Sequence, residues 1–94
     1  MKLLMIFVHE SKKEELEVFL RRQGVSHYSE VPEILGMGSS GPRLGSGAYP
    51  GKSALIMTLV DPDSLTQIRD AFGTFCETCG EEIRMFAWEV EQIR

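Results

Sequence analysis

Two continuous apolar runs, residues 2–8 and 53–60, constrain the fold of this sequence more than any other feature. Each run is short and rich in residues that favour strands, which is typical of a strand covered on both faces. Alternate residues of a strand point to opposite faces. In the first run these are Leu3, Met5 and Phe7 on one face, and Leu4, Ile6 and Val8 on the other. Both faces of such strands need a covering layer.

Two amphipathic segments predict helices. Ser11, with Glu14 three residues later, matches a capping box, and Gly24 is placed to end the first helix. Pro62 suits the first position of the second helix, which is predicted to end at Gly80. The residues at helical spacing on one face are Leu16, Phe19, Leu20 and Gln23 in the first helix, and Leu65, Ile68, Phe72, Phe75, Cys76 and Cys79 in the second.

Two further strands complete the pattern. Residues 26–35 alternate loosely, and Pro32 within them indicates an edge strand because proline cannot donate to a central ladder. Residues 83–93 predict the last strand. The order strand, helix, strand, strand, helix, strand predicts an α+β fold of the ferredoxin-like βαββαβ type, a four-stranded antiparallel sheet with two helices on one face. Residues 1–94 then form a single domain with a long flexible loop at 37–51.

The face of the sheet away from the helices has no covering element in this fold. Its two central strands are apolar there as well, and leaving apolar surface in water costs about 25 cal/mol for each Å². Copies of the chain that turn these faces toward one another remove that cost. We therefore expect a homo-oligomer.

Charge and hydropathy exclude several classes of partner. A net charge of −4 and an isoelectric point near 5.1 argue against nucleic acid, whose phosphates need clustered Lys and Arg. No apolar run approaches the roughly 20 residues of a membrane span, so direct membrane insertion is not expected. The first apolar run is followed at once by His9 and Glu10, which favours a strand over a signal peptide. We expect a cytoplasmic protein.

Residues 36–51 hold six of the nine glycines. Residues 36–41 match G-x-G-x-x-G, and residues 46–53 nearly match a phosphate-binding P-loop. Both motifs need a helix after the glycines to receive the phosphate, and none is predicted there. The segment is instead a connection between antiparallel strands that is longer than a hairpin requires, and loops of this kind often carry a binding function.

The predicted topology sorts the loops between two ends of the molecule. His9-Glu10, the loop 36–51 and the turn Cys79-Gly80-Glu81 lie at one end. His27 and Asp61-Pro62 lie at the other. We expect a site built from the distinctive residues at the first end.

Cys76 and Cys79 have C-x-x-C spacing and three open interpretations. They are structural residues of the second helix, or a redox pair that lacks the help of a helix amino terminus. A metal site is the third interpretation and would recruit His9 from the same end. No Ser-His-Asp or paired-carboxylate arrangement can be assembled from the sequence, and we expect no enzymatic activity.

With these elements placed, the sequence resembles the PII-type signalling proteins over nearly all of its 94 residues. "MKLLMIFV" is similar to the opening strand of that family, and "FAWEVEQI" is similar to its last strand. "EVPEILGMG" resembles "TEVKGFG", which puts Gly36-Met37-Gly38 at the base of the family's long T-loop. "ALIMTLVDPDSLTQIRDAF" resembles its third strand and second helix.

The resemblance implies a homotrimer whose sheets line its centre. It also implies small effectors, usually adenine nucleotides such as ADP, AMP or ATP, in clefts between subunits. A T-loop ordered by the ligand, here residues 39–51, would dock onto a transporter, an enzyme or a regulator. The ligand-binding residues implied here are Gly36, Met37, Gly38, Ser39, Ser40, Arg43, Gly80 and Arg84.

One departure from the family concerns the phosphate-binding loop. The family's loop resembles "TGKIGDGK", whereas residues 78–82 read "TCGEE", keeping the glycine and replacing lysine with acid. This predicts weaker ATP binding, which Arg43 and Arg84 would partly offset, and bicarbonate is a further expected effector. The alternative function is a metal-binding or metal-responsive module with the architecture of the CutA proteins, using His9, Cys76 and Cys79.

Overall fold

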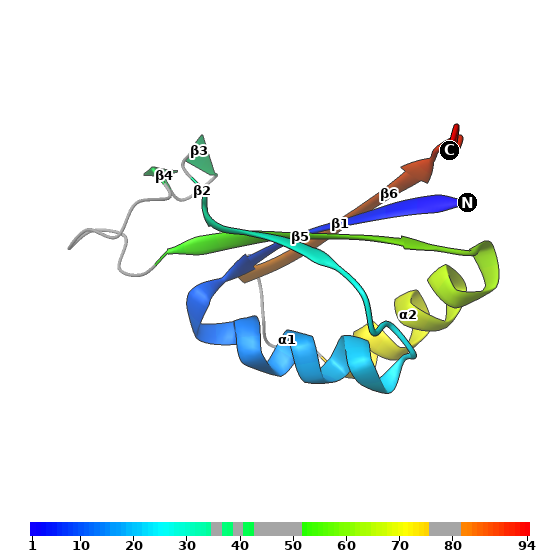
Figure 1. The fold of residues 1–94 in the computed structure, drawn as a ribbon. Helices are drawn as coiled ribbons and strands as arrows, with labels where there is room; N and C mark the ends of the chain where they lie inside the picture. Colours follow the sequence, from blue (N-terminus) through cyan, green and yellow to red (C-terminus); the bar gives the residue numbers. More distant parts are fainter. Residues whose placement is uncertain (35–36, 39–40, 43–51, 76–81) are drawn as a thin grey trace.

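The computed structural model describes residues 1–34, 37–38, 41–42, 52–75 and 82–94 (Figure 1). The elements of the main layer are β1 (Lys2–His9), α1 (Glu10–Arg22), β2 (Ser29–Ile34), β5 (Ser53–Val60), α2 (Pro62–Phe75) and β6 (Ile83–Glu89). Two short strands, β3 (Met37–Gly38) and β4 (Gly41–Pro42), pair with each other inside the segment predicted as a loop. The rest of that segment lies outside the described residues.

The four long strands form an antiparallel sheet in the order β2-β5-β1-β6. The two apolar runs are its central strands, and both helices lie on one face (Figure 1). The predicted βαββαβ fold is therefore confirmed. In the described part of the chain, no helix is both long and apolar enough to span a bilayer.

The core lies between the sheet and the helices. Leu4, Ile6 and Val8 of β1 are buried, and they alternate with Leu3, Met5 and Phe7, which are only partly covered. This alternation matches the prediction that the central strands are apolar on both faces. The core is completed by side chains from the other elements, chiefly Leu16, Phe19, Leu20, Ala54, Ile56, Val60, Leu65, Ile68 and Ile83.

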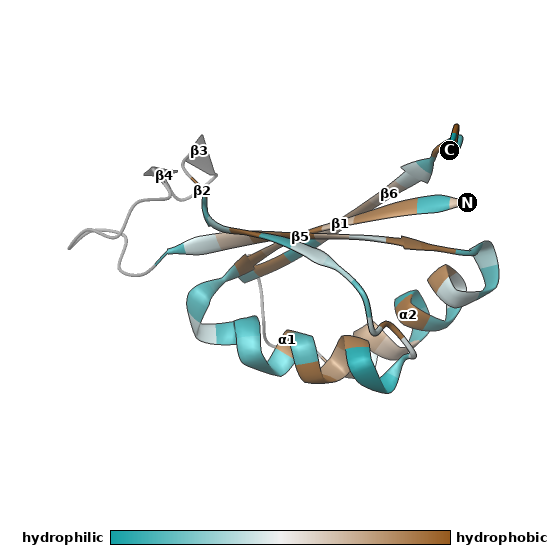
Figure 2. Ribbon diagram, viewed as in Figure 1, coloured by the Kyte–Doolittle hydropathy of each residue, from teal (hydrophilic) through white to brown (hydrophobic). Residues whose placement is uncertain are grey.

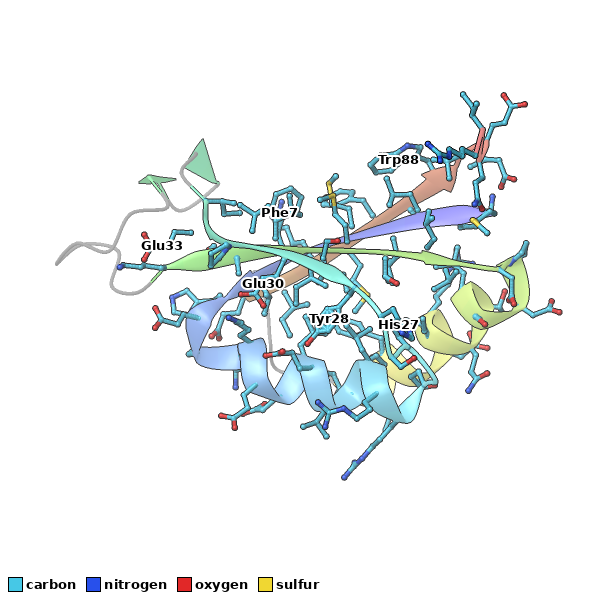
Figure 3. The ribbon with its side chains drawn as sticks, viewed as in Figure 1. Phe7, His27, Tyr28, Glu30, Glu33 and Trp88 are labelled. Carbon is cyan, nitrogen blue, oxygen red and sulfur yellow. The ribbon has the colours of Figure 1, made fainter. Side chains whose placement is uncertain are left out.

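The face of the sheet away from the helices, called here the open face, carries apolar side chains in contact with water. Leu59, Phe86 and Trp88 are 50%, 49% and 45% exposed. Phe7 and Trp88 stand on this side of the sheet, while the helices cover the other (Figure 3). Figure 2 shows apolar stretches along β1 and β5, the central strands of the sheet.

Helix α1 begins earlier than its sequence predicts. The N-cap is His9, whose Nδ1 accepts the backbone N–H of Ser11, so the prediction that Ser11 caps the helix with Glu14 is wrong. The imidazole does the work of a capping oxygen, because it satisfies one of the amides that the first turn leaves unpaired. The predicted stop is confirmed, since Gly24 follows the helix with a φ of 88°.

The outer strands are shorter than predicted. β2 is the edge strand that Pro32 indicated, and its register with β5 shifts between Val31 and Ile34. β6 ends at Glu89 rather than at residue 93, and the Glu89 carboxylate binds the amino terminus and Lys2, both at 3.0 Å. The described part of α2 ends at Phe75, so the predicted end at Gly80 lies outside the described residues.

Candidate functional site

Four strand ends meet at one end of the sheet, called here the loop end. His9 of β1 pairs with Ser53 of β5, and Ile34 of β2 pairs with the same Ser53. Ile83 opens β6 opposite Val8. The residues that flank the glycine-rich segment therefore lie beside the start of α1 and the start of β6, as predicted (Figure 1).

A hydrogen-bonded chain joins α1 to β6 at the loop end. Ser11 Oγ lies 2.8 Å from His9 Nδ1 and donates to Glu82 Oε2 at 3.0 Å. Glu82 directly precedes β6 and is 71 positions away from Ser11 in the sequence. The chain fixes the Glu82 carboxylate at the amino end of α1.

Ser53 has an unusual environment for a hydroxyl. Its side chain is almost completely buried, at 1% exposure, and its Oγ has no hydrogen-bond partner among the described residues. A buried hydroxyl without a partner loses about 1–3 kcal/mol of hydration that nothing replaces. It therefore marks a position where a ligand group would gain a hydrogen bond.

A small pocket adjoins Ser53. Its volume is about 150 Å³, and its lining residues are Glu10, Lys13, Pro32, Glu33, Lys52, Ser53 and Ala54. Small-molecule sites usually occupy roughly 300–1,000 Å³. The pocket is therefore large enough for one polar group of a ligand and too small to enclose a nucleotide by itself.

Both lysines of this pocket are held by carboxylates. Lys13 Nζ lies 2.5 Å from Glu30 Oε2, and the hydrogen bond to Glu30 raises the pKa of Lys13. Lys52 Nζ lies 2.8 Å from Glu33 Oε1, and this hydrogen bond raises the pKa of Lys52 and lowers that of Glu33. Glu30 and Glu33 both come from the edge strand β2 (Figure 3). Each ammonium group already has a negative partner.

A larger hollow, which the sequence did not predict, lies at the opposite end of the sheet. It measures about 560 Å³, and its lining residues are Leu3, His27, Tyr28, Ser29, Met57, Thr58 and Leu59. Thr58 Oγ1 donates to the carbonyl of His27 at 2.8 Å, which ties the start of β2 to β5. Tyr28 donates to Glu17, and this bond raises the pKa of Tyr28.

Most residues predicted to bind a ligand lie outside the described residues: Gly36, Ser39, Ser40, Arg43 and Gly80. Met37 and Gly38 form β3, opposite Pro42 and Gly41. Arg84 is placed opposite Phe7 in the sheet. The structure thus places Met37, Gly38 and Arg84 in the fold. The ligand-binding roles of all the predicted residues stay predictions.

The predicted metal ligands are only partly placed. His9 caps α1 at the loop end, while Cys76 and Cys79 lie outside the described residues. Within the described ranges, no group of three or more His, Cys, Asp or Glu side chains is arranged to hold a metal ion. The metal site therefore stays a prediction.

Solved structures supply the comparison. The fold matches CPII, a nitrogen regulatory PII-like protein from Thiomonas intermedia K12, bound to ADP, AMP and bicarbonate, with a TM-score of 0.78 and 24% identity over 99% of this chain and 88% of that one. The chain has the fold of a PII-like protein. The apo form of CPII matches with a TM-score of 0.71 and 20% identity, over 95% of this chain and 87% of that one.

The CPII complex with ADP, AMP and acetate has a TM-score of 0.75 and 22% identity, over 99% of this chain and 88% of that one. No protein-family model and no curated protein matches the sequence. At this level of identity, the PII-like fold is established by the shape of the chain rather than by its residues.

Proposed function

We propose that the protein is a PII-like regulatory protein that works as a homotrimer and binds a small effector in clefts between its subunits. The observation that carries this proposal is the open face, where Leu59, Phe86 and Trp88 are each about half exposed. Apolar surface of this kind on a small domain is typical of a protein interface. The PII-like fold supports three copies with their sheets turned inward.

The pocket beside Ser53 and the hollow beside Tyr28 could form the two different walls of a cleft between neighbouring subunits. In a closed ring, each subunit presents different surfaces to its two neighbours. The pocket beside Ser53 and the larger hollow beside Tyr28 lie at opposite ends of the sheet. The larger hollow is bordered by Leu3, Met57 and Leu59, which belong to the central strands β1 and β5. We propose that these two surfaces, from neighbouring subunits, enclose one ligand.

The effector we propose is an adenine nucleotide or another small anion. ADP, AMP and bicarbonate are bound to CPII, whose fold this chain shares. The glycines of the T-loop base would let the backbone approach the ligand, and Ser39, Ser40, Arg43 and Arg84 would hydrogen-bond its anionic group. Ser53 would add a hydrogen bond from the floor of the pocket.

The output we propose is a change in the T-loop, residues 39–51. When the effector orders this loop, it presents a surface to a protein partner such as a transporter. The protein itself would carry out no catalysis and would act in the cytoplasm.

Native mass spectrometry of the purified protein tests the assembly and any retained ligand together. We expect a mass of three subunits. Calorimetry with AMP, ADP and bicarbonate then tests binding, and limited proteolysis tests whether the ligand protects residues 39–51. A single subunit at micromolar concentration, or no binding by any of these compounds, would overturn the proposal.

The second candidate function is a metal-responsive module. It is favoured by the contact between Ser11 and Glu82, because Glu82 closes the segment that contains both cysteines and Ser11 adjoins the His9 cap. Zinc and copper contents of protein purified without chelators test it. Retention of all metal by a Cys79→Ser variant would exclude the site.

A further inference from the structure

We propose that residues 90–94 of one copy dock into an apolar groove between α2 and β6 of a neighbouring copy, with Ile93 as the anchor and Glu91 paired with Arg69. This inference rests on the proposed function, because it needs an assembly of several copies. It deepens that function by naming a second contact between subunits, outside the open face.

The groove lies on the helix side of β6, beside the outer edge of the sheet. Its volume is about 230 Å³. Leu4 and Ile68 line it and are almost completely buried, while Phe72 of α2 and Met85 of β6 are only partly covered. Small-molecule sites usually occupy roughly 300–1,000 Å³. The groove is therefore better suited to one or two apolar side chains of a protein segment.

The backbone of β6 offers hydrogen bonds next to the groove. β6 pairs with β1 on one side and is the last strand of the order β2-β5-β1-β6, so no described strand pairs with its other side. An edge strand presents a row of N–H and C=O groups that an extended segment can pair with. Alternate side chains of that segment would then point toward the groove.

The segment 90–94 has the side chains that such a groove requires. Ile93 is 92% exposed, more than any other large apolar residue in the described part of the chain. Glu91 stands two residues earlier, so an extended segment places both side chains on one face, about 7 Å apart. Arg69 lines the groove, and neither Arg69 nor Glu91 forms a salt bridge with a described residue. The apolar anchor and the charge thus each have a counterpart.

The groove of the same copy is a poor acceptor for this segment. The chain would have to reverse within residues 90–92, which contain no Gly, Asn, Asp or Pro to form a tight turn. The Val90 N–H instead donates to the carbonyl of Met1 at 3.0 Å, which keeps the chain beside β1. Figure 1 shows the end of the chain rising away from the helix layer. The segment therefore extends toward another copy.

The groove and the segment lie toward the same end of the sheet. Leu4, Leu65 and Ala87, which line the groove, stand near the start of β1, the start of α2 and the end of β6. The segment 90–94 emerges at this end, directly after Glu89. In a ring of copies with aligned ends, the segment of one copy lies level with the groove of the next.

The groove is also continuous with the proposed interface. Phe86, which meets Phe7 on the open face, is one of the residues that line the groove. A neighbour that covers the open face can therefore extend around the edge of β6 into the groove without leaving a gap.

Photo-cross-linking locates the segment directly. A benzophenone amino acid replaces Ile93, and the protein is assembled from equal parts of isotope-labelled and unlabelled chains. We expect cross-links that join a labelled chain to an unlabelled one, with the attachment in α2 or β6. The same amino acid in place of Val18, which is exposed on α1, is the control and should give no cross-link to the groove. Links from position 93 only within one chain, or only to other parts of a neighbour, would overturn the inference.

The rate of subunit exchange, measured by native mass spectrometry of the same labelled and unlabelled proteins, tests the anchor. Ile93→Asp should speed exchange at least tenfold, because each subunit loses one buried apolar side chain. The matched control is Gln92→Asp, which adds the same charge on the other face of the segment and should change the rate less than twofold. Equal rates for the two variants would contradict an anchor at Ile93.

A charge exchange tests the pairing of Glu91 with Arg69. Arg69→Glu and Glu91→Arg should each speed exchange about threefold or more, and the double variant should return it to within twofold of the wild type. A double variant that exchanges as fast as the single variants would refute the pair. A trimer that is insensitive to all these changes would overturn this inference alone, whereas a wild type that is a single subunit would overturn the proposed function as well.

Discussion

The rings of Phe7 and Phe86 meet edge to face on the open face, with centroids 5.9 Å apart and planes at 83°. Phe86 is nevertheless 49% exposed. An aromatic pair that is fixed by its neighbour and still open to solvent is well suited to an interface, because little side-chain freedom is lost when a partner covers it.

Replacing this ring with a charge tests the proposed trimer. We expect Phe86→Glu to dissociate the protein into folded single subunits, because the carboxylate would be buried without a partner in the assembly. The matched control is Val18→Glu, since Val18 is also exposed, at 39%, but lies on α1 and so on the helix side. Light scattering coupled to size-exclusion chromatography measures the mass. A trimeric Phe86→Glu protein would contradict the interface.

Two glycines provide a matched test of the backbone. Gly24 has a φ of 88°, and a Cβ added there would meet nothing within 4 Å, so Gly24→Ala tests conformational strain alone. We expect a loss of about 1–2 kcal/mol in the free energy of unfolding. Gly73 lies inside α2 with equally open space, and Gly73→Ala should gain about 0.5–1 kcal/mol. Urea denaturation of both variants measures the difference, and effects of the same sign would be inconsistent with it.

Much of the fold could be predicted because its signals are local. The continuous apolar runs at residues 2–8 and 53–60 identify central strands, Pro32 identifies an edge, and Gly24 identifies the end of a helix. Each signal depends on the conformation or hydrogen bonding of the residue itself. The order of elements then leaves few ways to connect them, and both the sheet order and the common side of the helices follow.

The start of α1 shows where such local signals fail. Ser11 is the usual type of capping residue, yet the helix begins immediately after β1 and the His9 ring takes the capping role. Histidine rarely caps a helix, so its position in the sequence carries little weight.

The sequence predicted which end of the sheet carries the candidate site, but it did not predict the buried hydroxyl of Ser53 or the hollow beside Tyr28. Ser53 is polar and opens an apolar run, which suggests an exposed strand end, but pairing with both His9 and Ile34 buries it. The hollow beside Tyr28 depends on how β2 leaves β5. Both features arise from contacts between distant segments, which a pattern within one segment does not record.

The hydrogen bonding of Asp61 predicts that the folded protein loses part of its stability in acid. Its carboxylate accepts the backbone N–H of Ser64 at 2.7 Å, and the hydrogen bonds from Ser64 hold the pKa of Asp61 below its ordinary value of 3.8. A carboxyl whose pKa is lowered on folding stabilises the native state above its unfolded pKa, and this contribution is lost as the pH falls through the folded value.

The matched variant is Asp61→Asn, which keeps a capping oxygen and removes the titration. We expect the stability difference between wild type and Asp61→Asn to be constant near pH 7 and to shift against the wild type below about pH 4. Asp63→Asn, which removes a charge from the same turn but leaves the cap, is the control. Urea midpoints between pH 7 and pH 2.5 measure the difference, and a difference that does not change with pH would refute the role of Asp61.

Substitutions of Ser53 and Thr58, two hydroxyl residues of β5, should change the stability of the protein in opposite directions. Ser53 Oγ is buried without a partner among the described residues, so Ser53→Ala removes an unsatisfied group and should raise the free energy of unfolding by about 1 kcal/mol. Thr58 Oγ1 donates to His27, so Thr58→Val keeps the shape, loses that bond and should lower the free energy by about 1 kcal/mol. Urea denaturation measures both changes.

In Ser53→Ala, the affinity for the effector should fall although the stability rises. If Ser53 donates to the effector, Ser53→Ala weakens AMP binding by roughly fivefold to tenfold, which corresponds to about 1–1.4 kcal/mol, although the variant is more stable. A variant that gains stability and loses affinity identifies a hydroxyl kept for its ligand, since a residue kept for packing would lose both. An unchanged AMP affinity in Ser53→Ala, measured by calorimetry on a fully trimeric sample, would remove Ser53 from the site.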